Sequence, residues 1–266
     1  MSLRFAPNQT GKIHLGHVRT CLANYLYAKK HNKKIYLRED FPHNTLKCVV
    51  KSHAEDLEWL GFRFDAKYEL ISVVVPVTHI IHSFLEKKDD KVELLSGETI
   101  ETNLSQYRWF KLLFPLIYED YVTFLDSDLV FAFYSFCFDV MFGVDTIIQG
   151  RDLQDILPLY LSLHKHLPEL REKLNPEYKQ WPRFLYLSLV IDEHGRKFDQ
   201  REGIGVLVES LKEKYSPEAI LNWAFHSLVK TEERKRTLDE MVEDFSIEKI
   251  NYEDVVFRWE DLDRWV

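Results

Sequence analysis

The chain has 266 residues, of which 45% are hydrophobic and 14% aromatic, and its formal net charge is −8 at pH 7. This composition predicts a globular protein with a buried core and excludes low-complexity and strongly basic nucleic-acid-binding classes. A local basic face for RNA is still compatible with the acidic total. Because the chain has no apolar run of about 18 residues and no basic and apolar leader, we expect no membrane contact and a cytoplasmic location.

The three cysteines, Cys21, Cys48 and Cys137, are widely separated in the sequence. They form neither a Cys-x-x-Cys pair nor the even spacing of a disulfide framework. We therefore expect buried, unpaired thiols and no metal site.

The first elements predict a nucleotide-binding sheet. Residues 3–6 predict a short buried strand, and residues 16–31 predict a helix with apolar side chains on one face. Residues 33–38 predict a second strand. A strand–helix–strand unit of this kind opens a parallel sheet that binds ligands at the carboxyl ends of its strands.

The later segments predict an interrupted continuation of this sheet. A helix is expected over residues 45–61, with Gly61 as its C-cap, and an insertion over about residues 68–128. The second half of the sheet is expected to resume near Val130, with a turn into a strand that ends near Gly150. Further elements are expected as a helix over 153–167, a strand over 184–191, and helices over 205–211, 216–228 and 238–245.

A tight turn after the first strand carries the sequence His14-Leu15-Gly16-His17 at the start of the first helix. A helix N-terminus offers unpaired N–H groups and a positive dipole end to a phosphate. His14 and His17 add imidazole donors for the charge that develops on a phosphate in a transition state. Gly16 leaves room for an adenine ring or a ribose. This segment therefore predicts a nucleotide site.

The segment from Arg4 to His17 resembles the first signature of class I aminoacyl-tRNA synthetases, specifically their glutamyl/glutaminyl branch. The resemblance continues in order over residues 56–62, 142–153, 182–186, 216–222 and 238–242. It implies an α/β fold: a Rossmann-type parallel sheet as catalytic core, an inserted connective segment and a C-terminal helical stem-contact region. In extent the chain resembles the short glutamyl-queuosine tRNA(Asp) synthetases, although it lacks their usual zinc-binding cysteines.

The resemblance implies a catalytic domain over residues 1–190, a signature loop with a stem-contact region over 191–266, and no anticodon-binding domain. It implies ATP-dependent activation of glutamate or a related amino acid to an aminoacyl adenylate, with Mg²⁺ accompanying ATP. The product is transferred to tRNA or to a modified tRNA base. Two alternatives stay open: a ligase with a non-tRNA acceptor, and an impaired paralogue that acts by binding or regulation. A separate chain that supplies the acceptor or a missing domain also stays open.

The resemblance assigns two groups of site residues. The catalytic and ATP-binding positions are His14, Gly16, His17, Lys197 and Arg201. The amino-acid-binding positions are Arg4, Ala6, Asn8, Glu39, Asp40, Phe131, Gln149 and Arg151, with Glu39 and Asp40 as alternatives for the acid that holds the substrate ammonium.

The sequence departs from the family pattern in two places. In the second signature loop, residues 195–203, Gln200 replaces the central lysine and Asp199 replaces a serine. Glutamate-specific members carry an arginine at the position of Gln149, where its guanidinium pairs with the substrate carboxylate. Arg151 faces the same side as Gln149 if the strand continues that far. Together these changes imply an altered substrate or altered chemistry.

Overall fold

The computed structural model describes residues 1–7, 12–39, 53–69, 91–93, 99–101, 127–199 and 202–266. The chain forms two compact units. The first unit contains residues 1–68, 145–154 and 182–266, and the second contains residues 69–144 and 155–181. In the described ranges no helix is long and apolar enough to cross a membrane.

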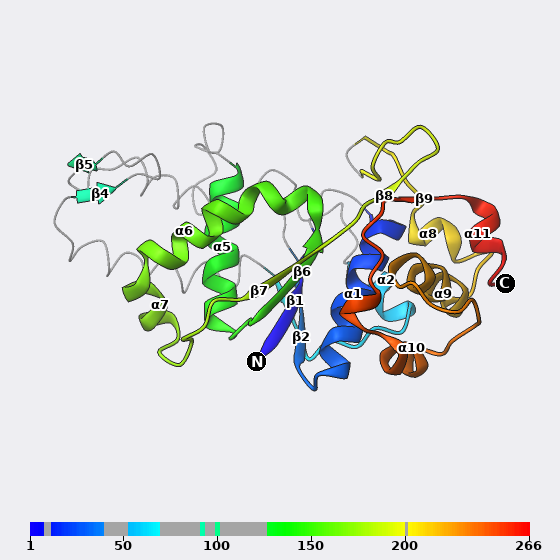
Figure 1. The fold of residues 1–266 in the computed structure, drawn as a ribbon, viewed down its shortest axis with the longest axis horizontal. Coiled ribbons are helices and arrows are strands. Elements are labelled where there is room, and N and C mark those ends of the chain that lie inside the picture. The colour runs from blue at the N-terminus through cyan, green and yellow to red at the C-terminus, as the bar shows by residue number, and fades with distance from the viewer. Residues whose placement is uncertain (8–11, 40–52, 70–90, 94–98, 102–126, 200–201) are drawn as a thin grey trace. The chain divides into compact units, whose positions relative to one another are not determined.

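A parallel sheet forms the centre of the first unit. Strand β1 (Ser2–Phe5) pairs in parallel with β2 (Lys34–Glu39), and β3 (Ala66–Glu69) lies on the other side of β2. Strand β6 (Thr146–Gly150) pairs in parallel with β7 (Arg183–Leu187). The Asp145 N–H donates to the Ser2 carbonyl at 3.1 Å, so the two ladders lie side by side (Figure 1). The predicted Rossmann-type α/β core is confirmed.

Helix α1 (Leu15–Lys30) confirms the predicted first helix but not its single buried face. It packs against β1 and β6 and also against α9 (Pro217–Leu228) and α10 (Leu238–Asp244) (Figure 1). Being covered by both the sheet and the C-terminal helices, it is buried almost all round. Its buried polar side chains therefore need internal partners: Asn24 Nδ2 donates to the Ile148 and Thr20 carbonyls, both at 2.9 Å.

The expected return of the sheet near Val130 is wrong, because residues 127–141 form helix α5 (Ser127–Met141). The chain turns at Gly143 (φ +66°) and enters β6 only at Thr146. A continuous aromatic run fits a buried strand and a buried helix equally well, so periodicity did not separate them. The aromatic run belongs to the core, since Phe133, Phe136 and Phe138 are all buried.

The other predicted elements are confirmed with shifted boundaries. Helix α2 (His53–Trp59) is followed by Gly61 at φ +97°, while residues 45–52 of its predicted range lie outside the described residues. The expected helix over 153–167 divides into the 3-10 helix η3 (Arg151–Ile156) and α6 (Leu157–His166), with Pro158 in the first turn of α6. The expected strand over 184–191 divides into β7 and β8 (Val190–Ile191), and α8 (Val208–Leu211) is shorter than predicted.

Several short elements had no clear sequence signal. They are β4 (Lys91–Glu93), β5 (Thr99–Glu101), α7 (Pro168–Leu174), η4 (Ile247–Lys249), β9 (Val255–Val256) and α11 (Trp259–Asp263). Strand β9 pairs in parallel with β8, a contact between segments about sixty-five residues apart that no local pattern encodes.

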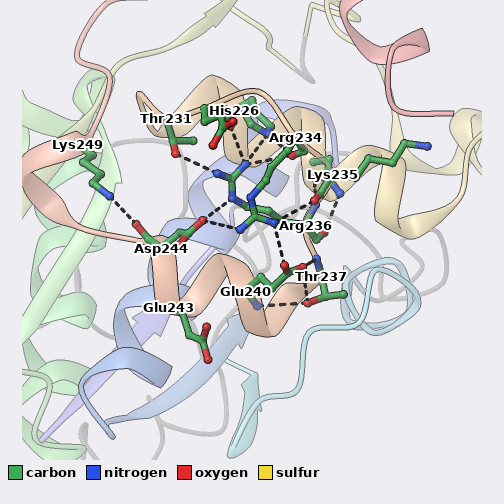
Figure 2. A network of polar contacts seen from close by, with 12 residues as sticks. His226, Thr231, Arg234, Lys235, Arg236, Thr237, Glu240, Glu243, Asp244 and Lys249 are labelled. Atoms are coloured by element: carbon green, nitrogen blue, oxygen red, sulfur yellow. Dashed lines mark hydrogen bonds and ion pairs between the residues drawn. The ribbon is translucent and has the colours of Figure 1, made fainter.

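Arg236 joins α9 to α10 (Figure 2). Its side chain is 2% exposed and donates to Asp244 Oδ2 at 2.6 Å, to Thr231 Oγ1 at 3.1 Å and to the Glu232 carbonyl at 2.9 Å. Arg234 is held in turn by Glu240 and Asp244. The basic run 234–236 is therefore largely neutralised within the first unit, where it fixes the connection between the two helices.

His164 lies in the core of the second unit and is 1% exposed. The rings of Phe136, Tyr160, Trp181 and Tyr178 surround it, with centroids 4.8, 4.9, 5.9 and 6.0 Å away. Neither of its ring nitrogens has a hydrogen-bond partner among the described residues. Burial lowers the pKa of His164 to about 4, so the ring is neutral at pH 7.

We expect this histidine to make the protein acid-sensitive. The unfolded side chain takes up a proton near its ordinary pKa of 6.5, whereas the folded one does so only near pH 4. Stability is therefore lost as the pH falls through this window, by about 2 kcal/mol between pH 7 and pH 5 from this residue. In His164→Phe that part of the loss should disappear from urea-unfolding curves at the two pH values.

The exposed His31 supplies the matched control for this measurement. His31→Phe should keep the wild-type pH dependence. An unchanged pH dependence in His164→Phe would contradict the assignment.

Candidate functional site

The histidines of the His14-Leu15-Gly16-His17 turn cap helix α1 reciprocally. The His17 N–H donates to His14 Nδ1 at 3.3 Å, and the His14 N–H donates to His17 Nδ1 at 3.4 Å. The two rings stack with centroids 3.8 Å apart and an interplanar angle of 24°. This arrangement is a capping box in which both partners are imidazoles.

The capping contacts also decide where each ring carries its proton. Since each Nδ1 accepts a backbone N–H, a neutral ring must hold its proton on Nε2. Burial lowers the pKa of His14 to about 4, against an opposing effect of the Asp199 carboxylate. Burial, and next the neighbouring His14 ring, lower the pKa of His17 well below its ordinary value. Both rings are therefore neutral at pH 7, and each offers one Nε2–H donor.

Gly16 makes room for the His14 ring. A Cβ added at Gly16 would lie 2.9 Å from His14 Cε1 and 3.0 Å from His14 Nδ1, closer than side chains tolerate. The group that approaches Gly16 closely in the structure is therefore the His14 ring of the chain itself. The role of Gly16 in ATP binding stays a prediction.

The described part of the second signature loop lies beside this pair. Asp199 and Ile204 exchange two backbone hydrogen bonds of 2.9 and 3.0 Å, which form an antiparallel bridge between these two residues. The edge of the Phe198 ring meets the His14 ring, with centroids 5.8 Å apart and an interplanar angle of 89°. Arg201, a predicted catalytic residue, and Gln200 lie outside the described residues.

The chain after the loop is tied to the start of α1. The Leu15 N–H donates to the Val206 carbonyl at 3.0 Å, and the Val208 N–H donates to the Ile13 carbonyl at 2.9 Å. Gly205 adopts φ +126°, and a Cβ added there would lie 2.9 Å from the Phe198 ring. The loop and the histidine pair therefore form one local structure.

Lys197, the predicted phosphate-neutralising lysine, lies between two carboxylates. Its Nζ is 3.4 Å from Asp152 Oδ2 and 3.9 Å from Asp199 Oδ2. The sequence analysis noted Asp199 but missed Asp152. The signal for Asp152 is weak, because an acid just after a strand is also a common helix-start residue.

The predicted amino-acid-binding residues of the first half lie at the carboxyl ends of β1 and β2. Arg4 is buried on β1 and pairs in register with Tyr36, and Ala6 directly follows that strand. Glu39, the last residue of β2, is 8% exposed, and its Oε1 accepts the Ala54 N–H at 3.4 Å. Asn8 and Asp40 lie outside the described residues.

Gln149 and Arg151, two predicted amino-acid-binding residues from the second half of the sheet, do not lie together as expected. Gln149 pairs in register with Tyr186, whose buried hydroxyl makes no hydrogen bond among the described residues although the Gln149 amide lies near it. The strand ends at Gly150, so the alternation expected to bring Arg151 to the Gln149 side does not reach it. Arg151 forms an ion pair with Asp254 instead.

Phe131, the remaining predicted residue, lies on α5 in the second unit, where it is partly buried. Among the described residues no cluster of three or more His, Cys, Asp or Glu side chains is placed to hold a metal ion.

A parallel sheet with a histidine-capped helix after its first strand defines a Rossmann-type α/β protein. Residues 1–90 match the family model described as "tRNA synthetases class I (E and Q), catalytic domain". Over residues 1–90 the chain is thus similar to the class I tRNA synthetases of the glutamyl and glutaminyl branch.

The similar proteins agree with this assignment. The glutamate–tRNA ligase of Hydrogenobaculum sp. is 26% identical over 97% of this chain and 66% of its own length. Glutamate–tRNA ligase 1 of Rickettsia prowazekii is 24% identical over 98% of this chain and 68% of its own length. The chain thus spans about two thirds of the length of these relatives.

The fold is also that of a solved structure. A glutamate tRNA ligase from Elizabethkingia meningosepticum, in complex with its amino acid, superposes with a TM-score of 0.69 at 19% identity. The superposition covers 100% of this chain and 68% of that one.

Proposed function

We propose that this chain activates an amino acid, glutamate or a relative of it, with ATP to an aminoacyl adenylate and transfers it to tRNA or to a modified tRNA base. The observation that carries the proposal is the stacked His14–His17 pair at the N-terminus of α1, with one Nε2–H donor on each ring. The family match over residues 1–90 supports it independently.

In the proposed reaction the amino-acid carboxylate attacks the α-phosphate of ATP, and pyrophosphate leaves. His14 and His17 would donate hydrogen bonds to the oxygens that gain charge as the phosphate becomes five-coordinate. Lys197 and Arg201 would neutralise the leaving pyrophosphate. No residue forms a covalent intermediate, so positioning and electrostatics supply the acceleration.

Arg4, Asn8 and either Glu39 or Asp40 would hold the backbone groups of the amino acid. The positive dipole end of α1 and the two Nε2–H donors are chemically suited to a triphosphate, while the Leu15 and His17 N–H groups are bonded within the chain. Mg²⁺ would enter with ATP and neutralise part of the triphosphate charge.

The substrate side chain would lie beside Gln149, Tyr186 and Arg151. Gln149 and Tyr186 offer an amide and a hydroxyl, and Arg151 is engaged by Asp254. Among these three residues no unpaired guanidinium is left for a substrate carboxylate, because that of Arg151 is already paired. We therefore expect glutamate to be a weaker substrate than a relative with a neutral, hydrogen-bonding side chain.

The test is ATP–pyrophosphate exchange with each of the twenty amino acids, with and without total tRNA. We expect exchange with one amino acid, and a dependence on tRNA would identify tRNA as the acceptor. Exchange without transfer to tRNA would favour the ligase with another acceptor. Absence of exchange by the folded protein under every condition would contradict activation and favour the binding or regulatory alternative.

A further inference from the structure

Two acids that the proposed mechanism does not use lie beside Lys197. Lys197 Nζ is 3.4 Å from Asp152 Oδ2 and 3.9 Å from Asp199 Oδ2, and the three side chains are 47%, 38% and 26% exposed. Lys197, Asp152 and Asp199 together carry a charge of −1. They lie where the loop is expected to contact a triphosphate, which is also negatively charged.

The fold holds both acids in place. Asp152 lies directly over Gly150: a Cβ added at that glycine would be 2.5 Å from Asp152 Oδ1. The absence of a side chain at residue 150 therefore makes room for the carboxylate. Asp199 is fixed by its two backbone hydrogen bonds to Ile204 and lies two residues after Lys197 in the sequence.

The acids also lie near the expected phosphate position. The segment 197–199, which carries Lys197 and Asp199, packs through Phe198 on the His14 ring. The Asp199 carboxylate is close enough to act electrostatically on His14. A triphosphate that reached the histidines would have to draw Lys197 away from its two acids and would approach the charge that they leave behind.

We propose that Asp152 and Asp199 form a carboxylate latch on Lys197, which holds the Lys197 side chain in ion pairs within the chain and lowers the affinity of the chain for the polyphosphate of ATP. The latch rests on the proposed function, since it acts on the same nucleotide site. Asp152 and Asp199 act through Lys197 and have no part in the bond changes themselves.

The experiment measures binding of Mg²⁺–ATP, and separately of inorganic pyrophosphate, by isothermal titration calorimetry. Exposed ion pairs are weak, so we expect Asp152→Asn and Asp199→Asn each to raise the affinity about two- to fivefold, and the double variant more. Glu193→Gln removes one negative charge from the neighbouring exposed turn and should leave the affinity unchanged. The gains should shrink at high salt, which screens such pairs.

A second set of variants tests whether the acids act through the lysine. In a Lys197→Met background, Asp152→Asn should raise the affinity clearly less than it does with Lys197 present, whereas a purely repulsive or structural role of Asp152 would leave its effect undiminished. A protein-only measurement accompanies this: acetylation of the Lys197 amine, followed by mass spectrometry, should become several-fold faster in Asp152→Asn. The reason is that the ion pair with Asp152 holds the amine away from the reagent.

The outcomes separate the latch from the proposed function. Unchanged or weaker ATP binding in the aspartate variants, alongside measurable wild-type binding, overturns the latch alone. An equal gain in ATP affinity from Asp152→Asn with and without Lys197 also overturns the latch alone. Failure of every variant to bind ATP or pyrophosphate overturns the proposed nucleotide site and the latch with it.

Discussion

His14→Asn is expected to lower the rate of amino-acid-dependent ATP–pyrophosphate exchange by about 10²–10³-fold, the usual effect of removing one donor to a developing phosphate charge. Asparagine keeps a side-chain oxygen that caps α1, so the helix start is preserved. What it removes is the Nε2–H of the first ring and its stack on His17. The drop should appear in the maximal rate more than in the half-saturating ATP concentration.

His31 provides the control on the same helix, because it is exposed at the C-cap of α1. His31→Asn should exchange at the wild-type rate. A His14→Asn protein that is as active as this control would show that the ring is needed only for the fold.

Arg19→Met is expected to lower the free energy of unfolding by about 3 kcal/mol. Arg19 is 1% exposed and donates to the Ser188 carbonyl and hydroxyl and to the carbonyls of Ser227 and Asn251. It thereby connects α1 with the chain after β7, the end of α9 and the segment before β9. Methionine fills a similar volume but removes the guanidinium donors of the buried Ser188 and Ser227 carbonyls, which costs more than the lost hydrogen bonds themselves, while the Asn251 carbonyl keeps the Ser188 hydroxyl as a donor.

Urea unfolding followed by tryptophan fluorescence measures this loss. Arg258→Met is the matched control, since Arg258 is exposed and a surface substitution usually changes stability by about 0.5 kcal/mol or less. Equal midpoints for Arg19→Met and Arg258→Met would contradict the role assigned to the buried guanidinium.

The parts of the molecule that were predictable are those encoded over a few neighbouring residues. The histidine pair, the helix start and the turn at Gly61 each depend on local spacing, and all three lie where the sequence placed them. The order of strand, helix and strand also followed from periodicity. Local patterns of this kind survive folding because their partners lie within one or two helical turns.

The parts that were not predictable depend on distant partners. Arg19 is buried because its hydrogen-bond partners at Ser188, Ser227 and Asn251 lie far away in the sequence, and the spacing of residues within α1 does not indicate this burial. The ion pair of the carboxylate latch joins Asp152 to Lys197, which are 45 residues apart in the sequence. Helix α5 was misjudged because its aromatic run satisfies two periodicities at once.

The most direct test of the central claim is the histidine side-chain ¹H–¹⁵N NMR spectrum with and without a non-hydrolysable Mg²⁺–ATP analogue, assigned through His14→Asn and His17→Asn. We predict that both rings are neutral with the proton on Nε2 at pH 7, and that both Nε2–H resonances shift when the analogue binds. Rings protonated on Nδ1, or resonances that stay in place at saturating analogue, would contradict the account that these two histidines bind the phosphate.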